Sequence, residues 1–279
     1  MGGDRVTTDN RLQGRRIGFI GGGNMAEAII RGLLAGGIAG EAIRVAEPVA
    51  VRREFLAKTY AVRACDDNGA VAADAELLVL AVKPQVAPAV LAQLREEIGT
   101  GTLVVSIMAG VPCSALEAPL QQGVRVVRVM PNTPSLVLEG ASALCGGSSA
   151  GPDDLALAEA LFALVGTTCR VDEKLMDAVT GLSGSGPAYA LAFIEALADG
   201  GVKNGIPRDT ALALAAQTLL GTARLLRETG EHPAALRDKV SSPGGTTIAG
   251  LYALEQGCLR GTVISAVDAA TARSKELGK

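Results

Sequence analysis

The first residues that could do chemistry are glycines spaced as G-x-G-x-x-A, directly after the apolar run Ile17–Ile20. Between a strand and a helix, the first glycine permits a tight turn and the second lets the backbone approach a pyrophosphate. The small last residue lets the helix pack closely on the strand. The helix start offers free N–H groups and the positive end of its dipole to phosphates. The pattern predicts a dinucleotide site formed by Gly21, Gly23, Asn24, Met25 and Ala26.

The residues after the next apolar run, Ile43–Ala46, leave the choice of nucleotide open. Glu47 lies where an acid would bind the hydroxyls of the adenosine ribose, which favours NAD. Arg52 and Arg53 follow closely and could instead accept the 2′-phosphate of NADP, or they could form a solvated first turn of a helix. The sequence therefore predicts NAD or NADP without choosing between them.

Three further segments lie where apolar runs end, at the edge where a parallel sheet binds ligands. They are Ala81–Gln85, Ser106–Gly110 and Met130–Pro134. Taken alone they would be ordinary turns, but their position after successive strands predicts that they line the nicotinamide pocket. The residues expected to contact the cofactor there are Ala81, Val82, Lys83, Pro84, Ala109 and Asn132.

A second glycine-rich segment, Val240–Thr247, interrupts the second half of the chain. Serine and threonine at a helix start are N-caps by default. This segment holds more glycine and hydroxyl residues than capping requires, and it could turn several N–H groups toward one point. Such a nest at a helix start binds a carboxylate. On residue chemistry alone, capping and carboxylate binding stand as equal alternatives.

The first half of the chain has the pattern of a scaffold for these segments. Short apolar runs alternate with helical patterns, which indicates βαβ units and a parallel sheet covered on both faces. We therefore expect an N-terminal α/β domain, a Rossmann-type doubly wound parallel sheet. Its expected strands are 17–20, 43–46, 76–82, 102–107 and 124–130.

From about residue 150 onward, Ala/Leu-rich helical segments replace the strand-like runs. Helices 187–203 and 211–226 are apolar over most of their circumference, and such helices need burial in a larger core. We expect them to form a subunit interface in an all-α dimerisation domain, with internal packing as the alternative. The expected parts are a flexible tail at 1–14, a dinucleotide-binding domain at 15–171 and the helical domain at 172–279.

Composition excludes several classes of protein. No uninterrupted apolar stretch approaches the roughly 20 residues of a membrane span, and the start lacks a signal peptide's apolar run, so we expect a cytoplasmic protein without a membrane partner. A net charge of −3 and the lack of a basic run argue against nucleic acid. The five cysteines are scattered, which predicts neither disulfides nor a metal site. His232, the only histidine, is expected in a turn or cap.

The order of these motifs resembles the Δ1-pyrroline-5-carboxylate reductase family. The resemblance runs from about Arg16 to Leu277, and the segment SSPGGTTIAGL is its most specific part. The strings that carry it are IGFIGGGNMAEAII, AVKPQ, SIMAGV, VRVMPNTP, TGLSGSGPAY, IEALADGGVKNGIPR, AAQTLLGTARLL, HPAALRDKVSSPGGTTIAGL and ATARSKEL.

The resemblance implies reduction of pyrroline-5-carboxylate to L-proline with NADPH or NADH, the last step of proline synthesis. It also implies a homodimer with interlocked helical domains, often five such dimers in a decamer, in which one chain's second glycine turn faces the nicotinamide of its partner. Thr247 would be catalytic, with its hydroxyl facing the ring nitrogen, and Lys83 and Asn132 would lie near the nicotinamide ribose. The implied substrate-binding residues are Ser242, Gly244, Gly245, Thr246 and Thr247.

One departure from a related family sharpens the expected mechanism. The 3-hydroxyacid dehydrogenases carry GxxGxGxxxKxxN at the start of their long helix, but here Ala190 replaces the lysine and Phe193 the asparagine. Oxidation of an alcohol needs a base to take the hydroxyl proton. A protonated imine is already electrophilic and needs only orientation and exclusion of water. Reduction of another cyclic imine and a non-catalytic nucleotide-binding regulator remain the alternatives.

Overall fold

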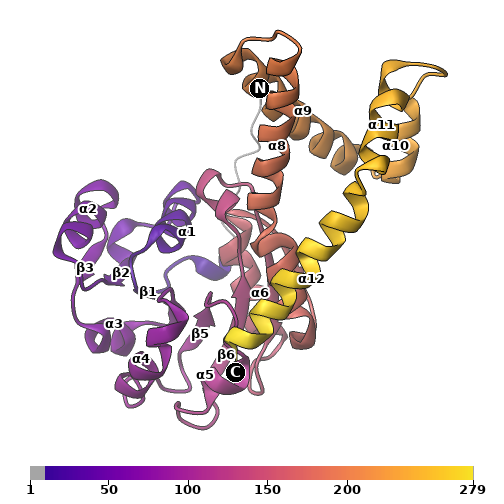
Figure 1. Cartoon of the computed structure of the whole chain (residues 1–279). Helices are drawn as coiled ribbons and strands as arrows, with labels where there is room; N and C mark the ends of the chain where they lie inside the picture. Colours follow the sequence, from indigo (N-terminus) through magenta and orange to yellow (C-terminus); the bar gives the residue numbers. More distant parts are fainter. Residues whose placement is uncertain (1–9, 279) are drawn as a thin grey trace. The chain divides into compact units, whose positions relative to one another are not determined.

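A computed structural model describes residues 10–278 of the chain. These residues form two compact units, labelled by element in Figure 1. The first unit contains the chain up to Gly184 and again from Ala270 onward, and the second contains Ser185–Ala269.

The first unit is built on one eight-stranded sheet in the order β3-β2-β1-β4-β5-β6-β7-β8. The direction of winding reverses between β1 and β4, which makes the sheet doubly wound and confirms the predicted α/β class. Neighbouring strands are parallel except for β6 and β7, which pair antiparallel. The strands are β1 (Ile17–Ile20), β2 (Ile43–Ala46), β3 (Arg63–Cys65), β4 (Leu77–Leu80), β5 (Leu103–Ser106), β6 (Arg125–Met130), β7 (Gly140–Gly146) and β8 (Gly166–Arg170).

Helices cover both faces of this sheet, because apolar residues alternate between the two sides of each buried strand. Ile17 and Phe19 of β1 belong to a core shared with α1, α2 and α6, whereas Ile20 belongs to a core shared with α3, α4 and α5. The helices of this unit are α1 (Asn24–Ala35), α2 (Ala50–Tyr60), α3 (Asn68–Asp74), α4 (Ala87–Gln93), α5 (Cys113–Glu117), α6 (Pro152–Ala163) and α7 (Met176–Val179).

Short helical turns complete the unit and connect its main elements. The 3-10 turns are η1 (Asn10–Leu12), η2 (Gly40–Ala42), η3 (Pro84–Val86), η4 (Thr133–Val137) and η5 (Glu173–Leu175), and Thr180–Gly184 forms a π turn.

The second unit consists of helices only, as predicted. Its elements are α8 (Gly186–Lys203), α9 (Arg208–Thr229), α10 (Pro233–Lys239), α11 (Thr246–Gln256) and the first part of α12 (Leu259–Leu277). Its buried core, within the described residues, consists of Ala198, Ala211 and Ala215. Large apolar side chains on the same helices stay exposed, such as Leu191 at 65% and Ile264 at 61%. Packing within one chain therefore does not bury these helices.

The two units divide the chain at Gly184, whereas the sequence placed the boundary at residue 171. The difference has a physical cause, because Met176 is fully buried in a core cluster with Cys113 and Cys145 and so ties α7 to the sheet. The predicted tail at 1–14 lies outside the described residues as far as residue 9. The next residues, Asn10–Leu12, form η1, and Leu12 is fully buried in the core.

None of the helices formed by residues 10–278 combines the length and apolarity needed to cross a membrane.

Candidate functional site

The first glycine turn lies at the point where the sheet reverses its winding. The Gly21 amide donates to the carbonyl of Ala46 on β2, and the Ala81 amide at the end of β4 donates to the carbonyl of Ile20. Gly21 has φ of +95°, and a Cβ there would stand 2.7 Å from the carbonyl oxygen of Ala81. Only glycine fits this position, as the sequence predicted from the need for a tight turn.

The backbone beyond this turn is open, as a phosphate site requires. Gly23 is the N-cap of α1, and no described side chain caps that helix. A Cβ built on Gly23 would meet no described atom within 4 Å. The uncapped N–H groups and the helix dipole can therefore receive a pyrophosphate here. The residues present fit the dinucleotide that the motif implies.

Glu47 lies at the end of β2 and ties two loops together. Its Oε2 accepts from the Gly22 amide and its Oε1 from the Val49 amide, both at 2.9 Å. The residue is only 9% exposed. The sequence predicted a ribose ligand at this position, and the structure adds a second role, since the same carboxylate fixes the glycine turn.

Arg52 and Arg53, the sequence's alternative ligands for a 2′-phosphate, both bind protein oxygens. Arg52 donates to the Gly22 carbonyl at 2.6 Å and to Glu27 Oε2 at 2.5 Å. Arg53 donates to the carbonyls of Glu47 and Pro48, both at 2.8 Å. In this arrangement the two arginines support the loop from within the protein.

The Glu27 carboxylate that receives Arg52 has a second donor, the hydroxyl of Tyr60 at 2.6 Å. Burial alone would raise the pKa of Glu27, but the hydrogen bonds from Tyr60 and Arg52 outweigh it and hold that pKa below its ordinary value. Burial, reinforced by the hydrogen bond to Glu27, raises the pKa of Tyr60. Glu27 is therefore ionised and paired at neutral pH.

Further along the sheet edge, a cavity of about 280 Å³ opens beside the glycine turn. Four residues predicted to bind the cofactor line it: Met25, Ala81, Val82 and Asn132. The Asn132 amide is bound on both sides, since it donates to the Ser183 carbonyl at 3.1 Å and accepts from the Ala141 amide at 2.8 Å. Asn132 therefore positions the wall of this cavity. Lys83, the N-cap of η3, is exposed.

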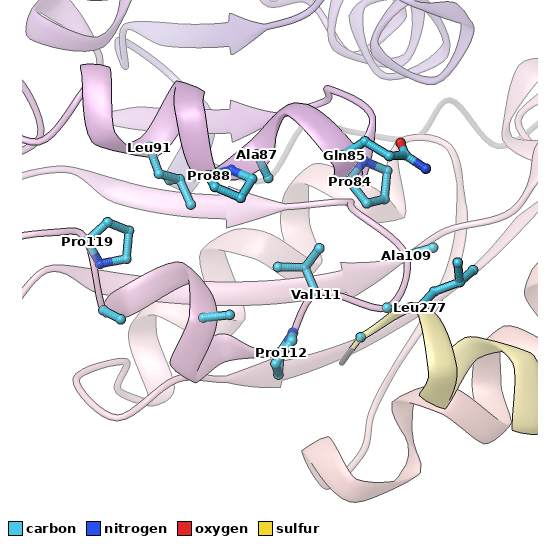
Figure 2. A pocket seen from close by; sticks show the side chains of 14 residues that line it. Pro84, Gln85, Ala87, Pro88, Leu91, Ala109, Val111, Pro112, Pro119 and Leu277 are labelled. Atoms are coloured by element: carbon cyan, nitrogen blue, oxygen red, sulfur yellow. The ribbon is translucent and has the colours of Figure 1, made fainter.

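Pro84 and Ala109 line a different and larger cavity, of about 570 Å³ (Figure 2). Its walls come from η3, α4, the loop before α5, α5 with the residues that follow it, and the end of α12, and they are mainly apolar. Leu277 and Gly278 at the end of the chain close one side. The structure thus separates these two predicted cofactor residues from the four that line the smaller cavity.

The second glycine turn lies in the second unit and also ends at an open helix start. Gly245 is the N-cap of α11, which no side chain of the described chain caps. Gly244 before it has φ of +66°, a left-handed conformation that favours glycine. Thr246 and Thr247 occupy the first turn of the helix, with Thr246 exposed and Thr247 half-buried. Ser242, which is exposed, accepts the Gly245 amide through its carbonyl at 3.0 Å. The helix start is therefore free of side-chain caps within the described residues, and carboxylate binding there stays a prediction of the sequence.

His232 has the capping role that its sequence context favoured. It is the N-cap of α10, and its Nδ1 accepts the Ala234 amide at 3.2 Å.

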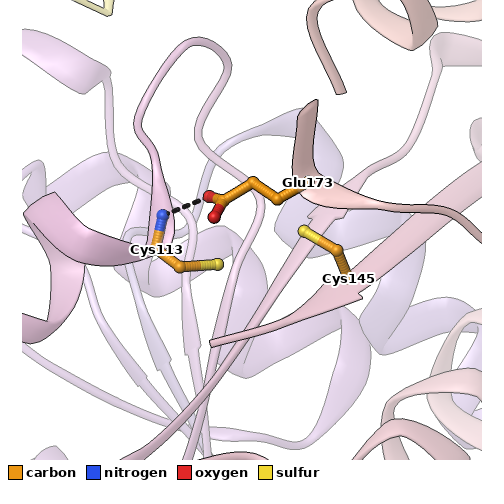
Figure 3. A group of neighbouring side chains, drawn as sticks. All are labelled: Cys113, Cys145 and Glu173. Carbon is orange, nitrogen blue, oxygen red and sulfur yellow. Dashed lines mark hydrogen bonds between the residues drawn. The ribbon is translucent and has the colours of Figure 1, made fainter. Parts of the chain in front are cut away.

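A group of two buried thiols and one half-buried carboxylate, which the sequence did not reveal, lies where the start of α5, β7 and η5 meet. Figure 3 shows the thiols of Cys113 and Cys145 beside the carboxylate of Glu173. The two sulfur atoms and a carboxylate oxygen lie within 4.8 Å of one another. The hydrogen bond between the thiols raises the pKa of Cys113, with burial adding to it, and lowers that of Cys145. Sequence spacing gave no signal, because the three residues come from separate elements.

Glu173 in this group already has partners. Its Oε1 accepts the Cys113 amide at 2.5 Å and lies 3.6 Å from Nη1 of the buried Arg128. The group therefore holds the start of α5 against the sheet. The absence of a metal site stays a prediction of the sequence.

Comparison with known proteins gives separate matches for the N-terminal α/β part and the C-terminal helical part of the chain. Residues 173–277 match a family model described as pyrroline-5-carboxylate reductase dimerisation, and residues 16–110 match one described as NADP oxidoreductase, coenzyme F420-dependent. A pyrroline-5-carboxylate reductase from Synechocystis is 52% identical over 95% of this chain and 98% of its own. The chain belongs to the pyrroline-5-carboxylate reductase family.

Solved structures of the family extend this agreement to the fold. The reductase of Coxiella burnetii superimposes with a TM-score of 0.90 at 39% identity, covering 95% of this chain and 99% of that one. The reductase of Plasmodium falciparum, solved with NADP bound, gives a TM-score of 0.87 at 33% identity, covering 96% and 100%. The family match shows that the chain uses NAD(P)H and that its helical domain serves homo-oligomerisation.

Proposed function

We propose that this chain reduces Δ1-pyrroline-5-carboxylate to L-proline, with NADPH or NADH as hydride donor. One observation carries the proposal: the two glycine turns each end at an uncapped helix start, one fitted to a pyrophosphate and the other to a carboxylate. A nucleotide sensor would need only the first. When bound, the nicotinamide supplies the hydride that adds to the carbon of the C=N bond, and the ring nitrogen keeps its proton as the amine of proline.

The second glycine turn holds the substrate carboxylate in this proposal. The amides of Thr246 and Thr247 provide hydrogen bonds at the positive end of the α11 dipole, and the Ser242 hydroxyl adds another. Gly245, whose amide donates to the Ser242 carbonyl, lies against the carboxylate as the N-cap of the helix. Gly244 supports these groups by adopting the left-handed conformation that turns the chain into the helix. Binding by amides fixes the carboxylate of the ring without requiring a charged side chain.

Thr247 is the proposed catalytic residue. Its hydroxyl donates or accepts a hydrogen bond, so it orients the ring nitrogen in either protonation state. A strong base is not required, because the protonated imine is already electrophilic. Ala190 and Phe193, at the places of the dehydrogenase lysine and asparagine, are consistent with that chemistry.

The cofactor is held by the first unit. The Gly21–Ala26 turn takes the pyrophosphate, Glu47 the adenosine ribose, and the edge formed by β4, β5 and β6 the nicotinamide half. At that edge Ala81 and Val82 exclude water, Asn132 fixes the wall, and exposed Lys83 lies beside the ribose. Pro84 and Ala109 shape the adjoining loops from the larger cavity.

Two chains are proposed to complete each active site. The exposed leucines of the second unit support a homodimer with interlocked helical domains, in which the turn at Gly245 faces the nicotinamide of the partner. Five such dimers would form the decamer that the family resemblance implies. Light scattering after size-exclusion chromatography measures the assembly, and a monomer that retains full activity would contradict the shared site. The cytoplasmic location remains a prediction of the sequence.

The decisive experiment follows the loss of NAD(P)H absorbance on adding pyrroline-5-carboxylate. We expect turnover and formation of L-proline. Two controls separate the alternatives: a six-membered cyclic imine carboxylate tests for a larger-ring reductase, and binding without turnover on either imine identifies a regulator. If pyrroline-5-carboxylate caused oxidation of neither NADH nor NADPH, the proposal would be refuted.

A further inference from the structure

We infer that the nucleotide site selects NADH over NADPH, because Glu47 places a fixed negative charge at the ribose edge while the nearby arginines are turned toward protein oxygens. The inference rests on the nucleotide half of the proposed function and deepens it. It concerns the one choice that the sequence left open, between Glu47 as a ribose ligand and Arg52 or Arg53 as ligands of a 2′-phosphate.

The position of Glu47 is set by the backbone. Hydrogen bonds from the Gly22 and Val49 amides, at 2.9 Å each, hold its two oxygens between the glycine turn and the loop after β2. In a sheet of this kind, the acid at that place meets the adenosine ribose. Each carboxylate oxygen keeps a second lone pair, so the group can accept both ribose hydroxyls.

A 2′-phosphate changes this contact from attraction to repulsion. The phosphate offers acceptor oxygens and, like other phosphate monoesters, carries a charge of about −1.5 to −2 at neutral pH. The Glu47 carboxylate has no proton to donate to it. Because Glu47 is mostly buried, solvent and salt screen the repulsion less than they would at the surface.

Arg52 is occupied by an ion pair of its own. Its guanidinium binds Glu27 and the Gly22 carbonyl and lies over the ring of Phe55, 5.1 Å from its centre. Tyr60 holds Glu27 from the other side at 2.6 Å. To reach a phosphate, Arg52 would have to leave a carboxylate that stays ionised at neutral pH, since its pKa is lowered.

Arg53 is occupied by the loop itself. Its Nη1 donates to the carbonyls of Glu47 and Pro48, and its Nη2 lies 3.4 Å from Asp66. Its side chain is only 22% exposed. The guanidinium therefore closes the carbonyl side of the loop, and turning it to a ligand would leave two carbonyl groups without that donor.

The exposed rim of the loop carries no charge. Val49 is 57% and Val51 79% exposed, in the segment between Glu47 and the arginines. These side chains can contact an adenine ring but offer nothing to a phosphate. Val49 binds Glu47 through its amide and has an exposed side chain, which makes it the place to introduce a cation as a test.

The primary test measures equilibrium dissociation constants of NADH and NADPH for the full chain, from nucleotide fluorescence at fixed ionic strength. We expect NADH to bind at least about tenfold more tightly. ADP-ribose and its 2′-phosphate are then compared by calorimetry; they lack the nicotinamide, so their binding is independent of any reduction. Equal or tighter binding of the phosphorylated member in both pairs would overturn the inference.

Variants locate the cause of the preference. Val49→Arg should strengthen NADPH binding relative to NADH binding roughly fivefold or more, and Val49→Gln, which is polar but neutral, should leave that ratio unchanged. Glu47→Gln should bring the two dissociation constants together. Because Glu47→Gln also disturbs the glycine turn, its thermal unfolding is measured alongside. If that variant does not fold, the comparison of Val49→Arg with Val49→Gln is the deciding test.

Arg52→Gln tests the competing assignment. We expect its ratio of NADH to NADPH affinity to match that of the unmodified chain. A selective loss of NADPH binding would mean that Arg52 reaches the phosphate and that the inference is wrong. Failure of the proposed function would give a different result. If the chain bound NADH more tightly than NADPH but did not reduce pyrroline-5-carboxylate, the inference would stand and the proposed reaction would be wrong.

Discussion

The turn at Gly21 and the turn at Gly244 both lead into a helix that no described side chain caps, but their surroundings differ. Around Gly21, strands β2 and β4 approach closely, and Glu47 and Arg52 bind the neighbouring Gly22. Around Gly244 the chain is exposed, and a Cβ there would meet no described atom within 4 Å. The first turn is fixed before any ligand binds. The second is held by its own backbone, through the hydrogen bond from the Gly245 amide to the Ser242 carbonyl.

The largest effect is expected from Gly21→Ala. The new Cβ would stand 2.7 Å from the Ala81 carbonyl at a backbone angle of +95°, so the turn must shift. We expect a loss of about 2–4 kcal/mol in the free energy of unfolding, measured with urea, and a loss of nucleotide binding.

Gly23→Ala is the matched control for that change. Its Cβ would meet open space, so stability should hold while a methyl group now faces the pyrophosphate. Equal destabilisation by both variants would mean that the first turn is no more tightly held than an ordinary loop.

Thr247→Ala should have the next largest effect, and on turnover rather than binding. Loss of the hydroxyl that orients the ring nitrogen should lower kcat by about a hundredfold. The dissociation constant of the nucleotide should stay within about twofold, since the first unit binds it. Thr246→Ala, which keeps the amide and removes an exposed hydroxyl, is the control. Collapse of nucleotide binding in Thr247→Ala would disprove the division of roles between the turns.

Gly244→Ala gives the direct counterpart of Gly21→Ala in the second turn. Here only the left-handed conformation opposes the substitution, at about 1 kcal/mol. We expect a KM for the imine raised by roughly fivefold and a free energy of unfolding lowered far less than in Gly21→Ala, because the amides lose their alignment without a steric clash. An effect on unfolding as large as that of Gly21→Ala would remove the contrast between the two turns.

The smallest effect is expected from Glu27, the carboxylate that pairs with Arg52 beside the first turn. The pKa of Glu27 is lowered in the folded state, so its contribution is complete above the ordinary value of 4.5 and is lost as the pH falls through the folded pKa. Glu27→Gln should lower stability at pH 7 by about 1 kcal/mol. The difference in the free energy of unfolding between this variant and the unmodified chain should shrink below about pH 4.5, as measured by denaturation at a series of acid pH values. Glu54→Gln, in an exposed pair with Lys58, should change neither quantity.

The first turn was predictable because its constraints are local. Glycine spacing, the apolar run before it and the acid after β2 all appear in sequence, and the predicted strands at 17–20 and 43–46 coincide with β1 and β2. The sequence missed β7 because Gly140–Gly146 is built from small residues without a β-branched run. It missed β3 and β8 because their residues are partly exposed. Periodicity carries no signal for such strands.

The candidate site was predictable in type and only partly in arrangement. Met25, Ala81, Val82 and Asn132 were expected together and line one cavity, whereas Pro84 and Ala109 line another. Which loop residues meet depends on side-chain direction and loop path, which spacing does not encode. The engagement of Arg52 with Glu27 is of the same kind, since the partners lie on different helices.

The return of α12 to the first unit changes how the chain would bear a pulling force. Ser274 donates to Asp177 at 2.7 Å and the Gly110 loop packs on the chain's last described residues, so both ends of the described chain belong to the same unit. Force applied between the two ends would load the sheet and this anchor first. Residues 185–269 lie between two segments of the chain that belong to the first unit, so they would carry no load while that unit and the anchor stay intact. They would feel tension only after the anchor at Asp177 had given way.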